Sequence, residues 1–176
     1  MSAKTQDRTI IHTGRVFTMV KETVSLANGT VAELDVIEHP GAAAIVPFIE
    51  TDRILMLRQY RHAIKTSLWE IPAGTLDPQE VELACAQREL TEETGYKAAG
   101  WQKLGEIVPV PGYSNERIHI YLATELTKDE QNLDEDEIIE VHQFAFDEAI
   151  AMVGRGEIQD AKTISGLFLA QQYLKK

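Results

Sequence analysis

Three glutamates, Glu89, Glu92 and Glu93, lie close together in the stretch from Gly74 to Tyr96. On a helix, Glu89 and Glu93 are one turn apart and share a face, with Glu92 beside them. Like charges at this spacing destabilise a helix by about 0.2–0.5 kcal/mol per pair, a cost that a bound cation removes. Hard divalent ions such as Mg²⁺ prefer carboxylate oxygens and keep several waters for substrate phosphates. The glutamates are therefore candidate metal ligands, although a solvated helix face would also explain them.

The residues around these glutamates predict a helix with defined ends. Asp77 is a good N-cap, Pro78 suits the first helical position, and Glu80 is placed to reach back in a capping box. Gly95 suits the left-handed residue just past the helix end. We therefore expect a helix from Pro78 to about Thr94 that presents the glutamates on one side.

Most of the rest of the chain is predicted to be β-structure. Residues 8–39 are rich in β-branched residues, and strands at 14–24 and 30–39 are joined by Asn28-Gly29, a strong hairpin signal. Further strands are expected at 42–49, 53–61, 67–74, 101–110, 117–126 and 141–146, and two closing helices at 147–156 and 161–176. Mixed strands with few helices predict an α/β sandwich.

Composition limits the classes of function. The chain has 176 residues and a net charge of −11, which argues against nucleic acid or an anionic membrane as partner because both attract basic surfaces. The single cysteine, Cys85, excludes an intrachain disulfide. With no signal-peptide pattern and no membrane-spanning stretch visible, the cytoplasm is the default compartment, and export is not excluded.

The same region resembles the Nudix box at every fixed position. The matching residues are Gly74, Glu80, Arg88, Glu89, Leu90, Glu92, Glu93 and Gly95. Tyr96, where the family usually has an aliphatic residue, is a departure that affects packing only. The resemblance covers essentially residues 10–175. It implies an α/β/α sandwich with a mixed sheet, and Mg²⁺-dependent (or Mn²⁺-dependent) cleavage of a nucleoside diphosphate linked to another group.

Roles follow from this resemblance one residue at a time. Glu89 and Glu93 resemble the main metal ligands, and Glu93 is counted as catalytic for that reason. Glu92 resembles a further or water-mediated ligand, and the backbone carbonyl of Ala73 another. The resemblance implies structural roles for the box residues Gly74, Glu80, Arg88 and Gly95.

Flanking stretches resemble the branch of the family that cleaves ADP-ribose and nucleotide sugars. They are Arg58-Gln59-Tyr60-Arg61, the Glu70-Ile71-Pro72-Ala73-Gly74 lead-in, and the loop Pro111-Gly112-Tyr113-Ser114-Asn115-Glu116. The resemblance implies substrate-binding roles for Arg58, Arg61, Glu70, Pro111, Tyr113, Ser114 and Glu116. Each stretch alone is a weak signal, and their order along the chain is what favours the branch.

The general base in this branch usually lies on an acidic loop before the strand that leads to the closing helices. That loop is residues 133–141 here, where Glu137 is the first candidate and Glu135 the second. A carboxylate beside a bound phosphate can take a proton from the attacking water. Most acidic residues of such a loop are simply solvated.

The stretch Asp160-Ala161-Lys162 gives information about substrate specificity. Asp160 is a good helix N-cap, and Lys162 would lie unfavourably against the helix dipole by a few tenths of a kcal/mol. The D-x-K pattern resembles general nucleotide-sugar hydrolases, including GDP-mannose cleavers. We expect Lys162 to contact a phosphate or sugar and Asp160 to hold it.

These observations predict a homodimeric enzyme that splits nucleoside diphosphate sugars of the ADP-ribose, GDP-mannose and ADP-glucose type into a nucleoside monophosphate and a sugar phosphate. The N-terminal β-sheet expected in residues 1–42 resembles the branch's dimerisation module, which implies a homodimer, although such a sheet could also merely cap the sandwich. Residues 43–176 are expected to form the Nudix domain. One alternative is a strictly ADP-ribose-specific hydrolase. Another, of a different class, is a non-catalytic module that senses nucleotides.

Overall fold

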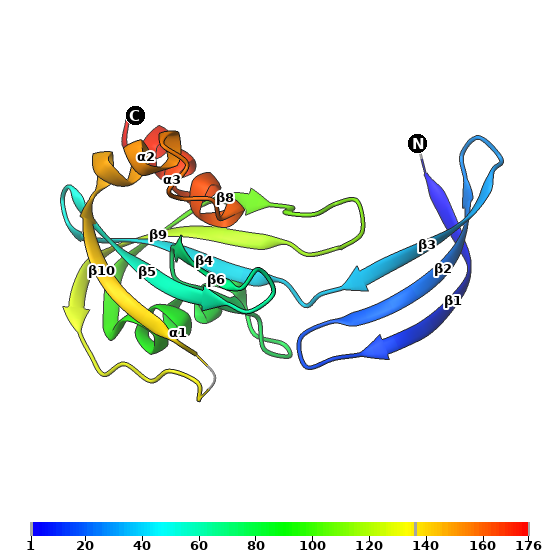
Figure 1. The fold of residues 1–176 in the computed structure, drawn as a ribbon, viewed down its shortest axis with the longest axis horizontal. Coiled ribbons are helices and arrows are strands. Elements are labelled where there is room, and N and C mark those ends of the chain that lie inside the picture. Colours follow the sequence, from blue (N-terminus) through cyan, green and yellow to red (C-terminus); the bar gives the residue numbers. More distant parts are fainter. Residues whose placement is uncertain (1, 136, 176) are drawn as a thin grey trace. The chain divides into compact units, whose positions relative to one another are not determined.

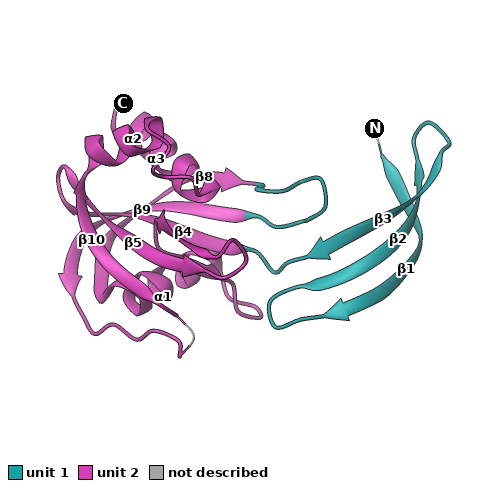
Figure 2. Ribbon diagram, in the orientation of Figure 1, with its two compact units in different colours: residues 1–41, 108–117 teal, residues 42–107, 118–176 magenta. Residues whose placement is uncertain are grey.

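A computed structural model describes residues 2–135 and 137–175, which form two compact units (Figure 2). The first unit comprises residues 1–41 and 108–117, and the second comprises residues 42–107 and 118–176. No helix within the described residues is long and apolar enough to cross a membrane.

The first unit contains a three-stranded antiparallel sheet in the order β1-β2-β3. Its strands are β1 (Ala3–Thr13), β2 (Thr18–Leu26) and β3 (Val31–Glu38). The predicted hairpin is confirmed, since Gly29 has a φ of 85° and its N–H donates to the Leu26 carbonyl across 2.9 Å. The sequence predicted two strands here, and the third, β1, is exposed along its whole length, so no buried alternation marked it.

The second unit is built on a seven-stranded mixed sheet. Its strands are β4 (Ala42–Glu50), β5 (Arg53–Arg61), β6 (Thr66–Glu70), β7 (Ala73–Thr75), β8 (Tyr96–Ile107), β9 (Ile118–Lys128) and β10 (Ile139–Ala145). The main path is β10-β5-β4-β9-β8, with β6 beside β5 and β7 beside β4. β4 and β9 run parallel, whereas the other pairs are antiparallel.

Helices cover both faces of this sheet (Figure 1). Successive side chains of β4 alternate between the two faces, as strand geometry requires. Ala44 and Val46 pack in the cluster that contains residues of α2 (Phe146–Gly154) and α3 (Ala161–Leu174). Ile45 packs instead with residues of α1 (Glu82–Thr94). The predicted α/β/α sandwich with a mixed sheet is confirmed.

The predicted start of α1 at Pro78 is wrong. The helix begins at Glu82, after an extended Val81 that makes no side-chain cap. Residues 77–80 form a turn instead: the Glu80 N–H donates to the Asp77 carbonyl, and Gln79 has a φ of 69°, which a helix does not allow. The end is as predicted, at Gly95 with a φ of 71°.

Candidate active site

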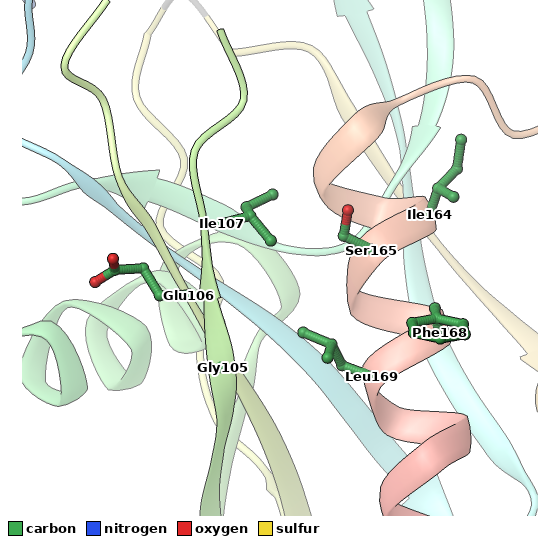
Figure 3. Close-up of a pocket in the computed structure, with 7 residues that line it drawn as sticks. All are labelled: Gly105, Glu106, Ile107, Ile164, Ser165, Phe168 and Leu169. Atoms are coloured by element: carbon green, nitrogen blue, oxygen red, sulfur yellow. The ribbon is translucent and has the colours of Figure 1, made fainter. Parts of the chain in front are cut away.

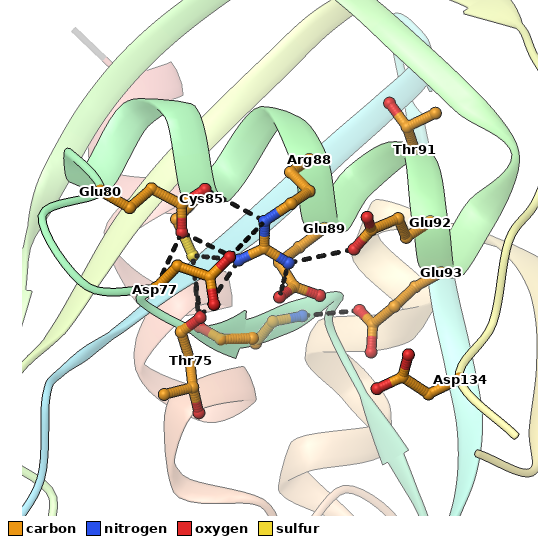
Figure 4. A network of polar contacts seen from close by, with 12 residues as sticks. Thr75, Asp77, Glu80, Cys85, Arg88, Glu89, Thr91, Glu92, Glu93 and Asp134 are labelled. Atoms are coloured by element: carbon orange, nitrogen blue, oxygen red, sulfur yellow. Dashed lines mark hydrogen bonds and ion pairs between the residues drawn. The ribbon is translucent and has the colours of Figure 1, made fainter. Parts of the chain in front are cut away.

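Arg88 organises a cluster of carboxylates on α1 and the preceding loop (Figure 4). Its guanidinium donates two hydrogen bonds to Glu80, at 3.0 and 2.9 Å, and bonds to Glu89 and Glu92 at 2.6 and 3.0 Å. It also donates to the backbone carbonyl of Thr75 at 3.1 Å. The two bonds from Arg88 to Glu80 lower the pKa of Glu80. One cation therefore joins three carboxylates and fixes the helix to the loop before it.

Gly74 allows the close approach of this loop to α1. A Cβ atom built at Gly74 would lie 1.8 Å from Oε1 of Glu89, well inside van der Waals contact. Any side chain at this position would displace the Glu89 carboxylate from its place beside Arg88. The absence of a side chain at Gly74 therefore leaves the space that the Glu89 carboxylate occupies in this arrangement.

Glu93 lies deepest in the cluster, with only 2% of its surface exposed. Its Oε2 accepts a hydrogen bond from the Ala73 N–H at 2.8 Å. Burial and the neighbouring charge of Glu89 raise the pKa of Glu93 well above its ordinary value, and the Ala73 N–H offsets this only in part. Burial likewise raises the pKa of Glu89 to about 7, against the opposing effect of Arg88. The cluster thus has more carboxylates than its single arginine can keep ionised.

The chemistry of this donor set fits a hard divalent cation. Glu89, Glu92 and Glu93 supply carboxylate oxygens, and two of the three are buried among like charges that a cation would relieve. In the arrangement described, Glu89 and Glu92 turn towards Arg88 and Glu93 towards Ala73. As a result, within residues 2–135 and 137–175 no three acidic, His or Cys side chains converge as a metal-binding group.

A second polar network surrounds Glu70, which is 1% exposed at the end of β6. Arg61 binds it through two parallel hydrogen bonds of 2.8 and 2.7 Å, and Lys162 pairs with the same carboxylate. Burial opposes ionisation of Glu70, but Arg61 and Lys162 outweigh it, so the pKa of Glu70 is lowered. The structure therefore brings together three of the predicted substrate-binding residues through contacts with one another.

Asp160 links this network to α3. It caps the helix by accepting the Thr163 N–H at 2.9 Å, and the same Oδ2 accepts from Lys162 at 3.1 Å. The two readings of Asp160, as N-cap and as holder of Lys162, are thus both present. Thr163 was not singled out from the sequence, although its position three residues after an N-cap aspartate is the place from which a side chain reaches back to the cap.

The two arginines of the Arg58–Arg61 stretch take different directions. Side chains alternate along a strand, so residues three apart project from opposite faces of β5. Arg61 joins Glu70, whereas the Arg58 guanidinium stacks over Trp69, 5.0 Å from its ring centre. The structure therefore does not group Arg58 with the network around Glu70.

The two candidate general bases, Glu137 and Glu135, differ in burial and in their contacts. Glu137 is half-buried, and its Oε2 accepts from the Asp134 N–H at 3.0 Å. Its charge raises the pKa of both Glu89 and Glu93, which places it near the cluster. Glu135 is exposed. Of the two, Glu137 is the one whose carboxylate acts on the glutamates of α1.

The predicted loop residues Pro111, Tyr113, Ser114 and Glu116 belong to the first unit. There the Tyr113 carbonyl accepts from the Ile37 N–H at 2.7 Å, and the Ser114 hydroxyl accepts from the Glu116 N–H at 3.1 Å. These bonds define the shape of the loop within its own unit.

An apolar hollow of about 420 Å³ lies between β8 and α3 (Figure 3). Among the residues that the structure describes, it is lined by Gly105, Glu106, Ile107, Ile164, Ser165, Phe168 and Leu169. None of these is a predicted site residue, and the carboxylate cluster lies on other elements.

Glu70→Gln is expected to lower the free energy of unfolding by about 3 kcal/mol, because it leaves Lys162 and Arg61 without their shared buried counter-charge. The folded-state pKa of Glu70 is depressed, so its stabilisation is present above the unfolded value of 4.5 and is lost as pH falls through the folded pKa. Urea unfolding should show a smaller difference between variant and wild type at about pH 3.5 than at about pH 7.

Glu50→Gln, at the exposed end of β4, is the matched control and should change little at either pH. A Glu70→Gln effect that stays constant across this pH range would contradict the ion-pair explanation.

Known proteins resemble this chain along most of its length. Residues 38–167 match the family model described as NUDIX domain. The chain is 35% identical to ADP-ribose pyrophosphatase of Bacillus subtilis (strain 168), over 99% of this chain and 94% of that protein. It is 37% identical to methanol dehydrogenase activator of Bacillus methanolicus, over 94% and 88% of the two chains. It is 41% identical to GDP-mannose pyrophosphatase of Yersinia enterocolitica serotype O:8, over 67% and 66%.

A solved structure of an ADP compounds hydrolase superposes with a TM-score of 0.87, covering 99% of this chain and 95% of that one. At 23% identity this likeness establishes the fold alone. The family match spans most of the chain and falls on the element that carries the glutamate cluster. The protein is thus a member of the Nudix hydrolase family.

Proposed function

We propose that this enzyme hydrolyses the pyrophosphate bond of nucleoside diphosphate sugars of the ADP-ribose, GDP-mannose and ADP-glucose type, with Mg²⁺ as cofactor and Mn²⁺ as a possible substitute. The products are a nucleoside monophosphate and a sugar phosphate. The observation that carries the proposal is the buried carboxylate cluster that Arg88 holds against the loop at Gly74. The relatives named ADP-ribose and GDP-mannose pyrophosphatase support the substrate class.

The residues that would hold the metal are Glu89, Glu92, Glu93 and the carbonyl of Ala73. When bound, a divalent ion neutralises the charge of a pyrophosphate and polarises its phosphorus–oxygen bonds. Arg88 keeps Glu89 and Glu92 in place, and the Ala73 N–H keeps Glu93 in place. We assign Glu137 as the group that would accept a proton from the attacking water, with Glu135 as the second candidate. The effect of the Glu137 charge on Glu89 and Glu93 supports this choice.

Binding of the rest of the substrate is assigned to the remaining predicted residues. Arg61, Glu70, Asp160 and Lys162 form one network and would act together. Arg58, Pro111, Tyr113, Ser114 and Glu116 are assigned on the family resemblance. Within the network of Arg61, Glu70, Asp160 and Lys162, the two positive charges are paired with the two negative charges in the absence of substrate.

The proposal has two competitors. A strictly ADP-ribose-specific hydrolase would use the same cluster and differ only in how it recognises base and sugar. A non-catalytic nucleotide sensor would not need the full set of carboxylates, and this chain has all of them. The enzyme with broad nucleotide-sugar specificity is therefore the leading interpretation.

A substrate panel tests these readings. Phosphate released by a coupled phosphatase is measured with ADP-ribose, ADP-glucose, GDP-mannose, UDP-glucose and 8-oxo-dGTP, with Mg²⁺ present or chelated. Metal-dependent cleavage of several nucleotide sugars is the expected result. Cleavage of ADP-ribose alone would favour the strict hydrolase. Binding without cleavage would favour the sensor.

Lys162→Ala is expected to reduce kcat/KM for GDP-mannose about tenfold more than for ADP-ribose if the ammonium contacts the sugar, which differs between the two substrates, and not the phosphates that they share. The exposed Lys175, at the end of the same helix, provides the control Lys175→Ala, which should leave both values unchanged. An equal loss for the two substrates would show that Lys162 does not determine specificity.

We also propose that residues 1–42 form the dimerisation region and residues 43–176 the catalytic domain. The first unit exposes large apolar side chains, including Ile10 at 56% and Val31 at 57%. Exposed apolar surface of this kind favours association with a second copy. Sedimentation equilibrium should give twice the chain mass, and a monomer at micromolar concentration would exclude this role.

A further inference from the structure

Thr163 lies where the first turn of α3 meets the segment Ile71–Gly74. The residue is fully buried, with 0% of its surface exposed. Its hydroxyl accepts the Ile71 N–H at 2.9 Å and donates to Oδ2 of Asp160 at 2.6 Å. Its own N–H donates to the same oxygen at 2.9 Å. The hydroxyl is therefore held in one orientation, with its acceptor side towards Ile71.

The segment that follows Ile71 is anchored at each residue. The Pro72 carbonyl accepts the Ile45 N–H of β4 at 2.9 Å. The Ala73 N–H donates to Glu93 at 2.8 Å. Thr163 thus fixes the beginning of a segment whose next residues carry both the Glu93 contact and the carbonyl assigned to the metal.

The side chain of Ile71 packs in the core cluster, and Ala73 and Gly74 pair with β4, while the Ile71 N–H is held by the Thr163 hydroxyl. Ile71 is 1% exposed, so bulk water does not reach its N–H. The preceding Glu70 is held by its side chain, through Arg61 and Lys162, and by pairing with Leu57 of β5. The hydrogen bond from the Ile71 N–H to Thr163 joins this fixed residue to α3. A buried N–H without an acceptor is strongly disfavoured, so removal of the hydroxyl would shift the segment.

We propose that Thr163 is a positioning residue that fixes Ala73 relative to Glu93, and through them the geometry of the carboxylate cluster. The effect on metal binding rests on the proposed function, whereas the effect on Ala73 does not. Thr163 also links the two networks of the site, because the same hydroxyl contacts Asp160, which holds Lys162. Groups that orient metal ligands typically change metal affinity by about 10–100-fold when removed.

The test compares Thr163→Val, which keeps the shape and loses the hydroxyl, with Thr163→Ser, which keeps the hydroxyl. Amide hydrogen exchange is followed by NMR on the full-length, metal-free protein. We expect the Ala73 amide to exchange at least about tenfold faster in the Val variant than in wild type or the Ser variant. The amide of Ala123, in the centre of β9, is the internal control for global unfolding.

Mn²⁺ affinity, measured by electron paramagnetic resonance without substrate, should fall about tenfold or more in the Val variant and recover in the Ser variant. An Ala73 amide that exchanges equally in the Val and Ser variants would overturn the proposal. If the Val variant does not fold, Thr163→Cys against Thr163→Ser repeats the comparison, because a thiol is a poor acceptor. Wild-type protein that neither binds Mn²⁺ nor hydrolyses the panel would overturn the proposed function, and the exchange comparison would still decide the role of Thr163.

Discussion

Glu93→Gln is expected to remove nearly all turnover and leave the fold intact. The loss in kcat should be at least about a thousandfold, equivalent to roughly 4 kcal/mol, because the side chain that we assign as a principal metal ligand loses its charge. The glutamine amide oxygen can still accept the Ala73 N–H, so the main local contact survives. Burial raises the pKa of Glu93, which means that a neutral side chain suits the metal-free site at least as well as a charged one.

Two measurements separate chemistry from folding. Hydrolysis of ADP-ribose and GDP-mannose gives kcat, and thermal unfolding with and without Mg²⁺ gives Tm. The metal-free Tm of the variant should equal or exceed that of wild type, whereas the rise in Tm on adding Mg²⁺ should be reduced. Glu82→Gln, the same chemical change in the first turn of the same helix, should retain activity. Near-normal turnover in Glu93→Gln would overturn the metal assignment.

Much of the fold could be predicted from local sequence patterns. The Asn28-Gly29 turn was predictable because these two residue types favour a tight hairpin turn. The common face of the α1 glutamates was predictable because helical spacing places them there. The strand β1 was not, since all its residues are exposed and no buried alternation marks it. An alternating pattern of apolar and polar residues reveals a strand when one of its faces is buried, and β1 has no buried face.

The start of α1 depended on contacts beyond the local sequence. Asp77, Pro78 and Glu80 have the types of a helix start, and Glu80 does reach back as predicted, because its Oε2 accepts the Asp77 N–H at 3.0 Å. The same carboxylate also binds Arg88, two turns into the helix. The two bonds between Asp77 and Glu80 close a turn in which Gln79 has a φ of 69°, and the helix begins after it, at Glu82. Thr163 was missed for a similar reason, because its partner Ile71 lies 92 residues away in the sequence. Spacing rules do not describe such pairs.

Glu137→Gln is expected to lower kcat by about 10²–10⁴-fold, the contribution usual for a general base. The glutamine can still accept the Asp134 N–H, so the loop should keep its shape. Because the charge of Glu137 raises the pKa of Glu89 and of Glu93, both pKa values should fall towards their ordinary values, and the metal-free protein should fold normally. KM should change much less than kcat, since proton transfer belongs to the transition state.

Glu135→Gln is the matched control, because it makes the same change two residues away on an exposed side chain. Steady-state kinetics of the two variants on ADP-ribose at saturating Mg²⁺ decide between the candidates. In Glu137→Gln the residual rate should climb with pH, because hydroxide replaces water that needs a base. A large loss in Glu135→Gln with little change in Glu137→Gln would reverse the assignment. Equal small losses in both would place the base outside this loop, and the charge of Glu137 would then serve only to tune the carboxylates of α1.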